Sequence, residues 1–499
     1  DPLTERFYTY TSSPEQESSL ASNMIYTIFQ DAGGVYWIAT LGVDQYDPYR
    51  SKFTHIISDP DDPKSLINKM VWSVYEDRQG DLWVGTQDGV TRFMAGGEVR
   101  HYRNDPTIAA SLGNNTVFSI YQDSQGKLWF GTGFGLSRYD EATDTFTNYP
   151  VYDYPIPVFE LIEDSQGMLW LGTGGNGVVA FERQTGQYTS YRHDSSDPDS
   201  LSDDNVLALT LDHTGTMWVG TYAGGLCKTT PATMDFTCHQ NDPEDETSLG
   251  SNAVLSFFRD SANRMWIATG GGGLNRFDLQ TGTFEQYREG DGLANDFVYG
   301  ILEDSEGFLW VSTNRGLSRF DPVTETFRNY TRNDGLQSDE FNQGAYCMTR
   351  DGRMIFGGVN GINIFDPLAI RDNPYLPPVV ITRFSLFYEA VIVGENPILP
   401  ESLQNVKSIT LSYRDDFFAF DFASLHYSAP EQIQYAYKLE GFDQDWVQAG
   451  NRHYAGYTNV PPGDYTFHVR ATNSDGVWNM NGAALAIKIT PPFWQTWWF

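Results

Sequence analysis

Residues 77–86 read DRQGDLWVGT, and near-copies of this stretch return along the first three quarters of the chain. Close copies occupy residues 123–132, 164–173, 212–221 and 304–313, and looser copies occupy residues 31–40, 260–269 and 351–358. The eight copies carry aromatic anchors at intervals of 41 to 48 residues: Trp37, Trp83, Trp129, Trp170, Trp218, Trp266, Trp310 and Phe356. Such a period is typical of propeller repeats.

Each repeat divides into four short β-rich runs separated by turn residues. In the copy around Trp129 the runs are residues 117–122, 128–132, 136–139 and 145–149. The Asp-x-x-Gly between the first two runs is a tight turn, because glycine accepts a positive φ. No stretch shows sustained helical periodicity with caps. The sequence therefore predicts an all-β chain with a β-propeller, in which the Trp residues pack between neighbouring blades.

The number of blades depends on how the ring closes. The last repeat offers three strands without a fourth, and residues 6–10 (RFYTY) resemble an isolated fourth strand. Pairing the two would remove an exposed sheet edge. We therefore predict an eight-bladed propeller over residues 1–373, closed by the N-terminal strand, with a seven-bladed ring as the alternative.

A different all-β segment follows the Pro-rich residues 373–378 (NPYLPP). Alternating strands with frequent turns predict an immunoglobulin-like sandwich over residues 374–490. The chain ends in the aromatic residues 491–499 (PPFWQTWWF). This segment is either a strand end packed on the sandwich or an interfacial juxtamembrane belt before a membrane helix beyond this chain.

Composition excludes several classes of function. The chain has 32 Lys and Arg against 65 Asp and Glu, a formal net charge of −33. So acidic a surface repels phosphate backbones and anionic lipids, so we expect no nucleic-acid partner. The 40% hydrophobic and 15% aromatic content supports packed cores and excludes a disordered chain. No run of eighteen apolar residues could span a bilayer.

The repeats resemble the two-component regulator propeller repeat. Residues 434–443 (QYAYKLEGFD), 457–465 (YTNVPPGDY) and 471–478 (ATNSDGVW) resemble the Y_Y_Y domain that follows such propellers. The resemblance implies the periplasmic or extracellular sensor half of a membrane receptor, with a transmembrane helix after the sandwich. It further implies a cytoplasmic histidine kinase, often a hybrid one, or a diguanylate cyclase, and a homodimer through the sandwich. Gut-bacterial members with two propellers carry more repeats than this sequence, so their oligosaccharide ligands do not transfer directly.

A ligand is expected where the loops entering the first strands meet the loops joining the second and third strands, on one face of the ring. Amides and aromatic rings there suit a small polar molecule or an oligosaccharide. The loops between second and third strands supply Gln87, Phe134, Asn176, Tyr222, Asn314, Arg315 and Asn360. Among these, Phe134, Tyr222 and Arg315 replace the Gly or small residues of other repeats. The loops before the first strands supply Asn23, Asn68, Asn115, Asp204, Asn252, Asp296, Asn342 and Gln343, whose alternative role is turn capping.

Enzyme and cofactor motifs are missing from the sequence. It has no G-x-S-x-G, H-E-x-x-H, Walker loop or C-x-x-C, so we expect no catalysis and no cofactor. The acidic loops 59–63 and 194–199 either hold an incidental Ca²⁺ or are Asx and Pro turns. One alternative is a secreted propeller lyase or hydrolase acting on polysaccharide, with Asp204, Asp296 and Glu340 as acid and base candidates. A protein-interaction platform is another alternative.

Three cysteines are too few for a disulfide scaffold. Cys227 and Cys238 face each other across one predicted hairpin, where an oxidising compartment would permit a disulfide. The alternative is two independent small residues. Cys347 has no evident partner.

Overall fold

The computed structural model describes residues 11–12, 19–49, 52–150, 155–371 and 373–495. It divides into two compact units, one of residues 52–370 and one of residues 1–51 with 371–499. Nearly all regular structure is β-strand. Within the described residues the helical segments are single 3-10 turns: η1 (Glu289–Asp291), η2 (Arg332–Asp334), η3 (Pro367–Ala369), η4 (Pro430–Gln432) and η5 (Phe493–Gln495).

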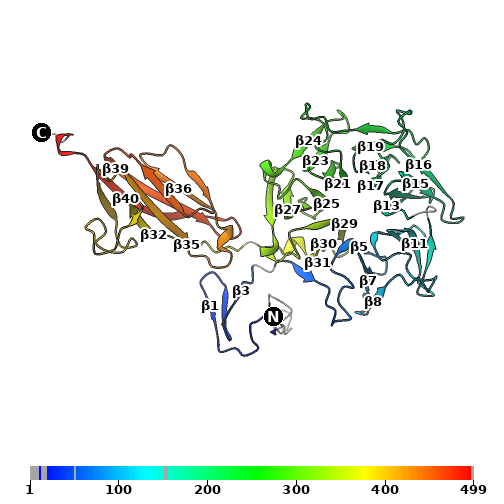
Figure 1. Cartoon of the computed structure of the whole chain (residues 1–499), viewed down its shortest axis with the longest axis horizontal. Coiled ribbons are helices and arrows are strands. Elements are labelled where there is room, and N and C mark those ends of the chain that lie inside the picture. The colour runs from blue at the N-terminus through cyan, green and yellow to red at the C-terminus, as the bar shows by residue number, and fades with distance from the viewer. Residues whose placement is uncertain (1–10, 13–18, 50–51, 151–154, 372, 496–499) are drawn as a thin grey trace. The chain divides into compact units, whose positions relative to one another are not determined.

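Seven four-stranded antiparallel sheets make up the described part of the unit 52–370 (Figure 1). Six of them take four consecutive strands each: β5 (Val71–Glu76), β6 (Leu82–Thr86), β7 (Gly89–Phe93), β8 (Val99–Tyr102); β9 (Val117–Gln122), β10 (Leu128–Thr132), β11 (Gly135–Asp140), β12 (Thr145–Tyr149); β13 (Val158–Glu163), β14 (Leu169–Thr173), β15 (Val178–Phe181), β16 (Tyr188–Tyr191); β17 (Val206–Leu211), β18 (Met217–Thr221), β19 (Leu226–Thr229), β20 (Thr237–His239); β21 (Val254–Arg259), β22 (Met265–Thr269), β23 (Leu274–Phe277), β24 (Phe284–Tyr287); β25 (Val298–Glu303), β26 (Leu309–Thr313), β27 (Gly316–Asp321), β28 (Thr326–Tyr330). The seventh joins β29 (Phe341–Met348), β30 (Met354–Gly358) and β31 (Gly361–Phe365) to β4 (Thr54–Ile56).

These sheets form a closed ring. The first strand of each sheet packs against the first strand of the next, and β29 packs against both β25 and β5. The predicted all-β propeller is confirmed. The prediction of eight blades is wrong, because the described residues of this unit form seven blades, which was the alternative.

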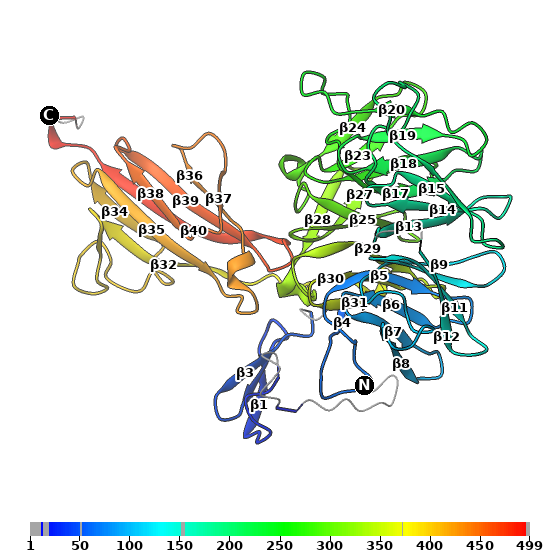
Figure 2. The same cartoon turned by 45° about the vertical axis from the view of Figure 1, so that its right-hand side comes forward.

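Closure uses a different strand from the predicted one. Residues 6–10 lie outside the described residues, and the fourth strand of the last blade is β4, in which Ile56 pairs with Ile362. Phe53, just before β4, is 2% exposed, and its ring centroid lies 4.8 Å from that of Phe365. Figure 2 shows β4 beside β31. The chain immediately before the first inner strand thus supplies the closing strand, and Phe53 takes the place that Phe146 holds in β12.

The first repeat lies outside the ring. Its strands β1 (Thr27–Gln30), β2 (Tyr36–Ala39) and β3 (Val43–Tyr46) form a separate three-stranded sheet in the other unit. Ile28 and Val43 are 56% and 71% exposed, whereas their ring counterparts Val74 and Val90 are buried. The first copy of the motif therefore adds a sheet without adding a blade, and the ring spans residues 54–365 rather than 1–373.

A carboxylate–indole hydrogen bond explains the repeated motif. In six blades, and again in the sheet β1–β3, the Asp Oδ2 accepts the Trp Nε1–H of the same copy at 2.7–3.2 Å. Asp77 shows the pattern: its Oδ1 also accepts the backbone N–H of Asp81 at 3.0 Å. The Asp therefore ties the turn to the indole, satisfying a polar group that would otherwise be buried unpaired.

The Trp and Gly of the motif fit each blade against its neighbour. Trp83 is fully buried in a cluster with Val117 and Phe130 of the next blade, which confirms the predicted packing role. Gly85 lies so close to that blade that a Cβ there would stand 2.9 Å from the Val117 carbonyl oxygen. A side chain at this position would push the two sheets apart.

Residues 379–490 form a sandwich, as predicted. One sheet has the order β33 (Glu389–Ala390), β32 (Val379–Leu386), β35 (Phe417–Ser424), β38 (Tyr454–Thr458), and the other has the order β34 (Ser408–Ser412), β40 (Trp478–Thr490), β39 (Gly463–Thr472), β36 (Tyr435–Glu440), β37 (Val447–Gly450). Their inner faces bury one core, in which Phe420 stacks on Phe467 at 4.2 Å between ring centroids. Within the same unit, the sheet β1–β3 contacts the sandwich through Trp37 and Tyr427, 6.3 Å apart.

Candidate functional site

Backbone hydrogen bonds hold the two predicted sets of loops together on one face of the ring. The Gln87 N–H donates to the Met70 carbonyl at 3.0 Å, and the Tyr222 N–H donates to the Asn205 carbonyl at 2.9 Å. The Asn314 N–H bonds Phe297 in the same way at 3.2 Å. Each of these turns between second and third strands is therefore fixed to the loop that enters the first strand of the same blade. Side chains on these turns stand on a rigid support.

Five of the predicted residues are exposed on these turns: Gln87, Phe134, Tyr222, Asn314 and Arg315. Phe134 and Tyr222 are 57% and 63% exposed, so both aromatic faces are open to solvent. The Arg315 guanidinium lies 3.3 Å from Glu289 and keeps most of its surface. The Asn314 side-chain carbonyl accepts the Tyr299 hydroxyl at 2.7 Å. Exposed rings, amides and a cation are groups that bind polar or polyhydroxylated molecules.

The predicted residues before the first strands serve mainly as caps. The Asn68 Oδ1 accepts the Met70 N–H at 2.8 Å, and the Asp296 Oδ1 accepts the Glu289 N–H at 2.7 Å. Asp204 accepts the His193 N–H at 2.7 Å and pairs with Arg192. These carboxylates and amides hold their own loops, which is the alternative role given above. The acid and base candidates Asp204 and Asp296 are thus each bonded to the backbone of a neighbouring loop residue.

Three predicted ligand contacts are turned inward. Asn176 is fully buried, and its Nδ2 donates to the Ser190 hydroxyl at 3.0 Å. Asn342 is 6% exposed and donates to the Val71 carbonyl at 2.8 Å. Asn360 is partly buried and bonds the backbone of Gln337 at 3.0 Å. The prediction of surface contacts at Asn176 and Asn342 is wrong, because both amides satisfy buried backbone or side-chain groups.

A bulge in β29 carries side chains across the axis of the ring. Residues between Phe341 and Tyr346 leave the ladder with β30. The Gln343 Nε2 donates to the carbonyls of Leu207 and Leu255, at 2.9 and 3.2 Å, on the distant inner strands β17 and β21. Gly344, with φ +73°, lets the bulge approach the carbonyls of Trp72 and Phe118. The polar residues 342–344 (NQG) interrupt an otherwise apolar inner strand, and this interruption could have predicted the bulge from the sequence.

Aromatic side chains on the inner strands were missed by the sequence analysis. Trp72 and Phe118 lie 5.6 Å apart, and Phe118 and Phe159 lie 5.1 Å apart, each pair edge to face. All three are partly exposed. They occupy the second position of successive inner strands, so they form an arc on blades one to three, and a repeat-by-repeat alignment of that position could have found them.

One inner strand carries a carboxyl group where the others carry small residues. Glu160 aligns with Ser73, Ser119, Ala208, Ser256, Gly300 and Ala345. Burial raises the pKa of Glu160 to about 7. Burial, together with the Glu160 charge, raises the pKa of Tyr346 to about 12. Gly300 leaves room for the Tyr346 ring, which a Cβ at residue 300 would meet at 2.3 Å.

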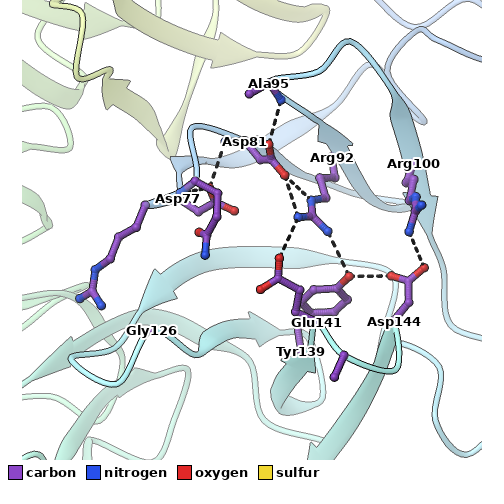
Figure 3. Close-up of polar contacts among 12 residues, drawn as sticks. Asp77, Asp81, Arg92, Ala95, Arg100, Gly126, Tyr139, Glu141 and Asp144 are labelled. Atoms are coloured by element: carbon purple, nitrogen blue, oxygen red, sulfur yellow. Dashed lines mark hydrogen bonds and ion pairs between the residues drawn. The ribbon is translucent and has the colours of Figure 1, made fainter.

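A polar network joins the outer strands of blades one and two (Figure 3). Arg92 pairs with Asp81 at 2.7 Å and donates to the Tyr139 hydroxyl at 3.1 Å. That hydroxyl donates to Asp144 at 2.6 Å, and Arg100 pairs with the same carboxylate at 2.9 Å. The adjoining cavity measures about 30 Å³, which is room for water only. The two arginines and the two aspartates are paired within the network, which therefore stabilises the contact between the two blades.

Cys227 and Cys238 form a disulfide across β19 and β20. Cys347 is a free, partly buried thiol, and burial raises its pKa to about 11. The acidic loops make Asx turns: Asp59 and Asp194 accept backbone N–H groups two residues on, at 2.9 Å. Within the described residues, no three His, Cys, Asp or Glu side chains gather closely enough to hold a metal ion.

Two family models match the chain. The two-component regulator propeller family matches residues 19–42, 65–88, 111–134, 200–223, 248–271 and 292–315, and the Y_Y_Y domain matches residues 426–490. The chain carries two-component regulator propeller repeats followed by a Y_Y_Y domain. The first match covers β1 and β2 of the separate sheet, so the two-component regulator repeat occurs both inside and outside the ring.

Two solved structures to which the chain is similar are extracellular domains. The extracellular domain of the hybrid two-component system BT3049 from B. thetaiotaomicron aligns with 97% of this chain at 28% identity and a TM-score of 0.78. The extracellular domain of the one-component system BT4673 from the same organism aligns with 98% of this chain at 23% identity and a TM-score of 0.52, which supports the fold. This chain covers 64% and 66% of those chains.

A curated relative is a kinase. Histidine kinase P4 of Formosa agariphila is 30% identical over 218 residues, which are 43% of this chain and 16% of that protein. The match therefore spans less than half of this chain and a small part of the relative. No helix among the described residues is long and apolar enough to cross a membrane.

Proposed function

We propose that this chain is the periplasmic or extracellular sensing part of an inner-membrane receptor of the two-component type. The observation that carries the proposal is the alignment of 97% of the chain, at 28% identity, with the extracellular domain of a hybrid two-component system. The match to a histidine kinase supports a kinase as the cytoplasmic output. A homodimer through the Y_Y_Y domain and a transmembrane helix beyond residue 499 belong to the same proposal.

The propeller face that carries Phe134, Tyr222 and Arg315 is the proposed signal site. These side chains are exposed on turns fixed to neighbouring loops, so binding needs little ordering of the backbone. The rings offer stacking surfaces for sugar C–H groups, and Arg315 offers donors for hydroxyl or carboxylate groups. We therefore propose a small polar molecule or an oligosaccharide as the signal.

A thermal-shift screen of the full chain against monosaccharides, oligosaccharides and small carboxylic acids tests this site. We expect at least one compound to raise the melting temperature. The triple variant Phe134→Ala/Tyr222→Ala/Arg315→Ala should bind that compound at least about tenfold more weakly, since each lost contact typically contributes about 1 kcal/mol. The fold should be unchanged, because all three side chains are exposed.

The matched control is Leu279→Ala/Val323→Ala. These residues are 45% and 86% exposed on turns between third and fourth strands, on the other face of the ring. The control variant should bind as the original chain does. Equal affinity in the triple variant would remove this face as the signal site, and turnover of an added oligosaccharide would favour the enzyme alternative.

A further inference from the structure

The hairpin between β32 and β33 has an unusual turn. Leu386 pairs with Glu389, so Phe387 and Tyr388 alone make the connection. Their φ angles are +48° and +70°. Two-residue turns with both φ angles positive favour Asn and Gly, because a bulky side chain is crowded in the left-handed region. Two aromatic residues therefore occupy positions that smaller residues would fill with less strain.

The folded chain draws little packing from these two rings. Phe387 is 50% exposed and Tyr388 is 83% exposed. Tyr388 stacks on Phe417 at 4.3 Å, and this contact leaves its other face open. Strained residues that persist without a packing role point to a function outside the fold.

More exposed aromatic side chains lie at the same end of the sandwich. Phe493 and Trp494 follow β40 and are 58% and 49% exposed, with the Trp494 ring on Tyr413. The loop after β36 adds Phe442, which is 44% exposed. Strand register groups these segments within each sheet: Leu386 pairs with Phe418 in one, and Ser412 with Thr490 in the other. The Phe442 ring, in the loop after β36, lies 6.0 Å from that of Tyr457 in β38 and so joins the two groups. Figures 1 and 2 both show the end of β40 and the loop after β32 at one end of the sandwich. We call Phe387, Tyr388, Phe442, Phe493 and Trp494 the aromatic end.

The chemistry of the aromatic end fits one kind of surface. Phe, Tyr and Trp together prefer the zone between lipid headgroups and acyl chains, where rings are buried and polar tips stay wet. Exposed acidic side chains stand among them, Glu389, Asp416 and Asp445, and these outnumber the exposed basic residues Arg414 and Lys488 at this end. They repel anionic surfaces, so a zwitterionic lipid surface is the better match.

We propose that the aromatic end of the Y_Y_Y domain rests on the zwitterionic lipid surface of the membrane, with the Phe387–Tyr388 turn as its anchor. The proposal rests on the proposed receptor function, which would hold this end of the sandwich near a bilayer. In this proposal the aromatic end sets the orientation of the Y_Y_Y domain on the membrane, and none of its residues belongs to the signal site.

Hydrogen exchange on vesicles tests the contact. The full chain with a C-terminal hexahistidine tag is held on phosphatidylcholine vesicles that contain a nickel-chelating lipid, and its exchange is compared with that of the chain in solution. The amides of residues 386–390 should exchange at least about fivefold more slowly on the vesicles, because burial at the interface limits their opening. Residues 425–434, at the opposite end, should be unaffected. Adding anionic phosphatidylglycerol should reduce the protection.

The variant Phe387→Asn/Tyr388→Gly separates contact from folding. Asn and Gly suit the turn, so the melting temperature should rise by about 1–3 °C. Protection of residues 441–446 and 491–494 on vesicles should nevertheless fall. The matched control is Val477→Ser/Met480→Ser, which removes exposed apolar side chains from the opposite end and should keep the protection.

Unchanged exchange of residues 386–390 on the vesicles would overturn the proposal. Equal protection without vesicles in concentrated solution would also overturn it, by showing that a second copy of the chain covers this surface. Neither result touches the ligand screen, which is done without lipid, so failure of the membrane contact and failure of the signal site remain distinguishable.

Discussion

Replacing Trp310 by alanine is expected to lower the free energy of unfolding of the propeller by about 3–5 kcal/mol. Trp310 is fully buried between the sixth and seventh blades, in a cluster with Phe341 and Phe356. Its Nε1–H donates to Asp304 at 2.8 Å, so the substitution also leaves a buried carboxylate oxygen without its partner. Urea unfolding followed by tryptophan fluorescence and circular dichroism measures the loss.

The chain supplies its own control for this substitution. Trp37 has the same motif and the same bond to its Asp, at 3.0 Å, but lies in the sheet β1–β3 and is partly exposed. Trp37→Ala should cost less than about 1.5 kcal/mol, because little cavity forms at a partly exposed site. Equal losses at both positions would show that the motif stabilises its own hairpin, and that packing between blades matters little.

The second large effect depends on pH. Glu160→Gln is expected to stabilise the propeller by about 3 kcal/mol at pH 8 and to have little effect near pH 4, because one pKa unit corresponds to about 1.4 kcal/mol. Folding raises the pKa of this carboxyl group to about 7 from its ordinary value of 4.5. A raised carboxyl pKa means that the folded chain holds a proton that the unfolded chain releases between these values. The free energy of unfolding of the original chain therefore falls as the pH rises through this window.

The difference between variant and original chain isolates this group. Other carboxylates act in the opposite direction: the Thr107 hydroxyl and N–H groups lower the pKa of Asp105, and similar bonds lower that of Asp194. Their contribution cancels in the difference. Glu244→Gln, which removes an exposed carboxyl group, is the control and should change the free energy of unfolding by less than about 0.5 kcal/mol. If the difference in free energy of unfolding between Glu160→Gln and the original chain stays constant from pH 4 to pH 8, folding does not raise the pKa of Glu160.

The sequence predicts the kind of ring but miscounts its blades. The period, the turns and the single Trp per repeat follow from local physics, and they determine a propeller of four-stranded sheets. Whether a given repeat becomes a blade of the ring depends on its packing against other repeats, which the motif itself does not determine. The copy around Trp37 has the full motif, yet Val43 is 71% exposed, and the closing strand comes from residues 54–56. Phe53 and the alternating residues after it match the pattern around Phe146 in β12. This match could have predicted that residues 53–56 form the closing strand.

The candidate site was predicted in part, and the errors share one cause. Exposure of Phe134, Tyr222 and Arg315 follows from their place on short turns between second and third strands. Asn176 and Asn342 were assigned to the surface because they are polar, but each amide satisfies groups inside the fold. Hydrogen-bond partners distant in sequence, such as Gln343 with Leu207, depend on how the ring closes and are not visible in a single repeat.

Hydrogen exchange of the full chain with the compound that gives the largest thermal shift tests the account most directly. If the ring senses its signal on the predicted face, residues 133–134, 222–225 and 314–315 should exchange several-fold more slowly with the compound bound, because bound groups open less often. Turns on the other face, at residues 140–145 and 321–326, should be unchanged. Protection confined to that other face, or to the sandwich alone, would contradict the account.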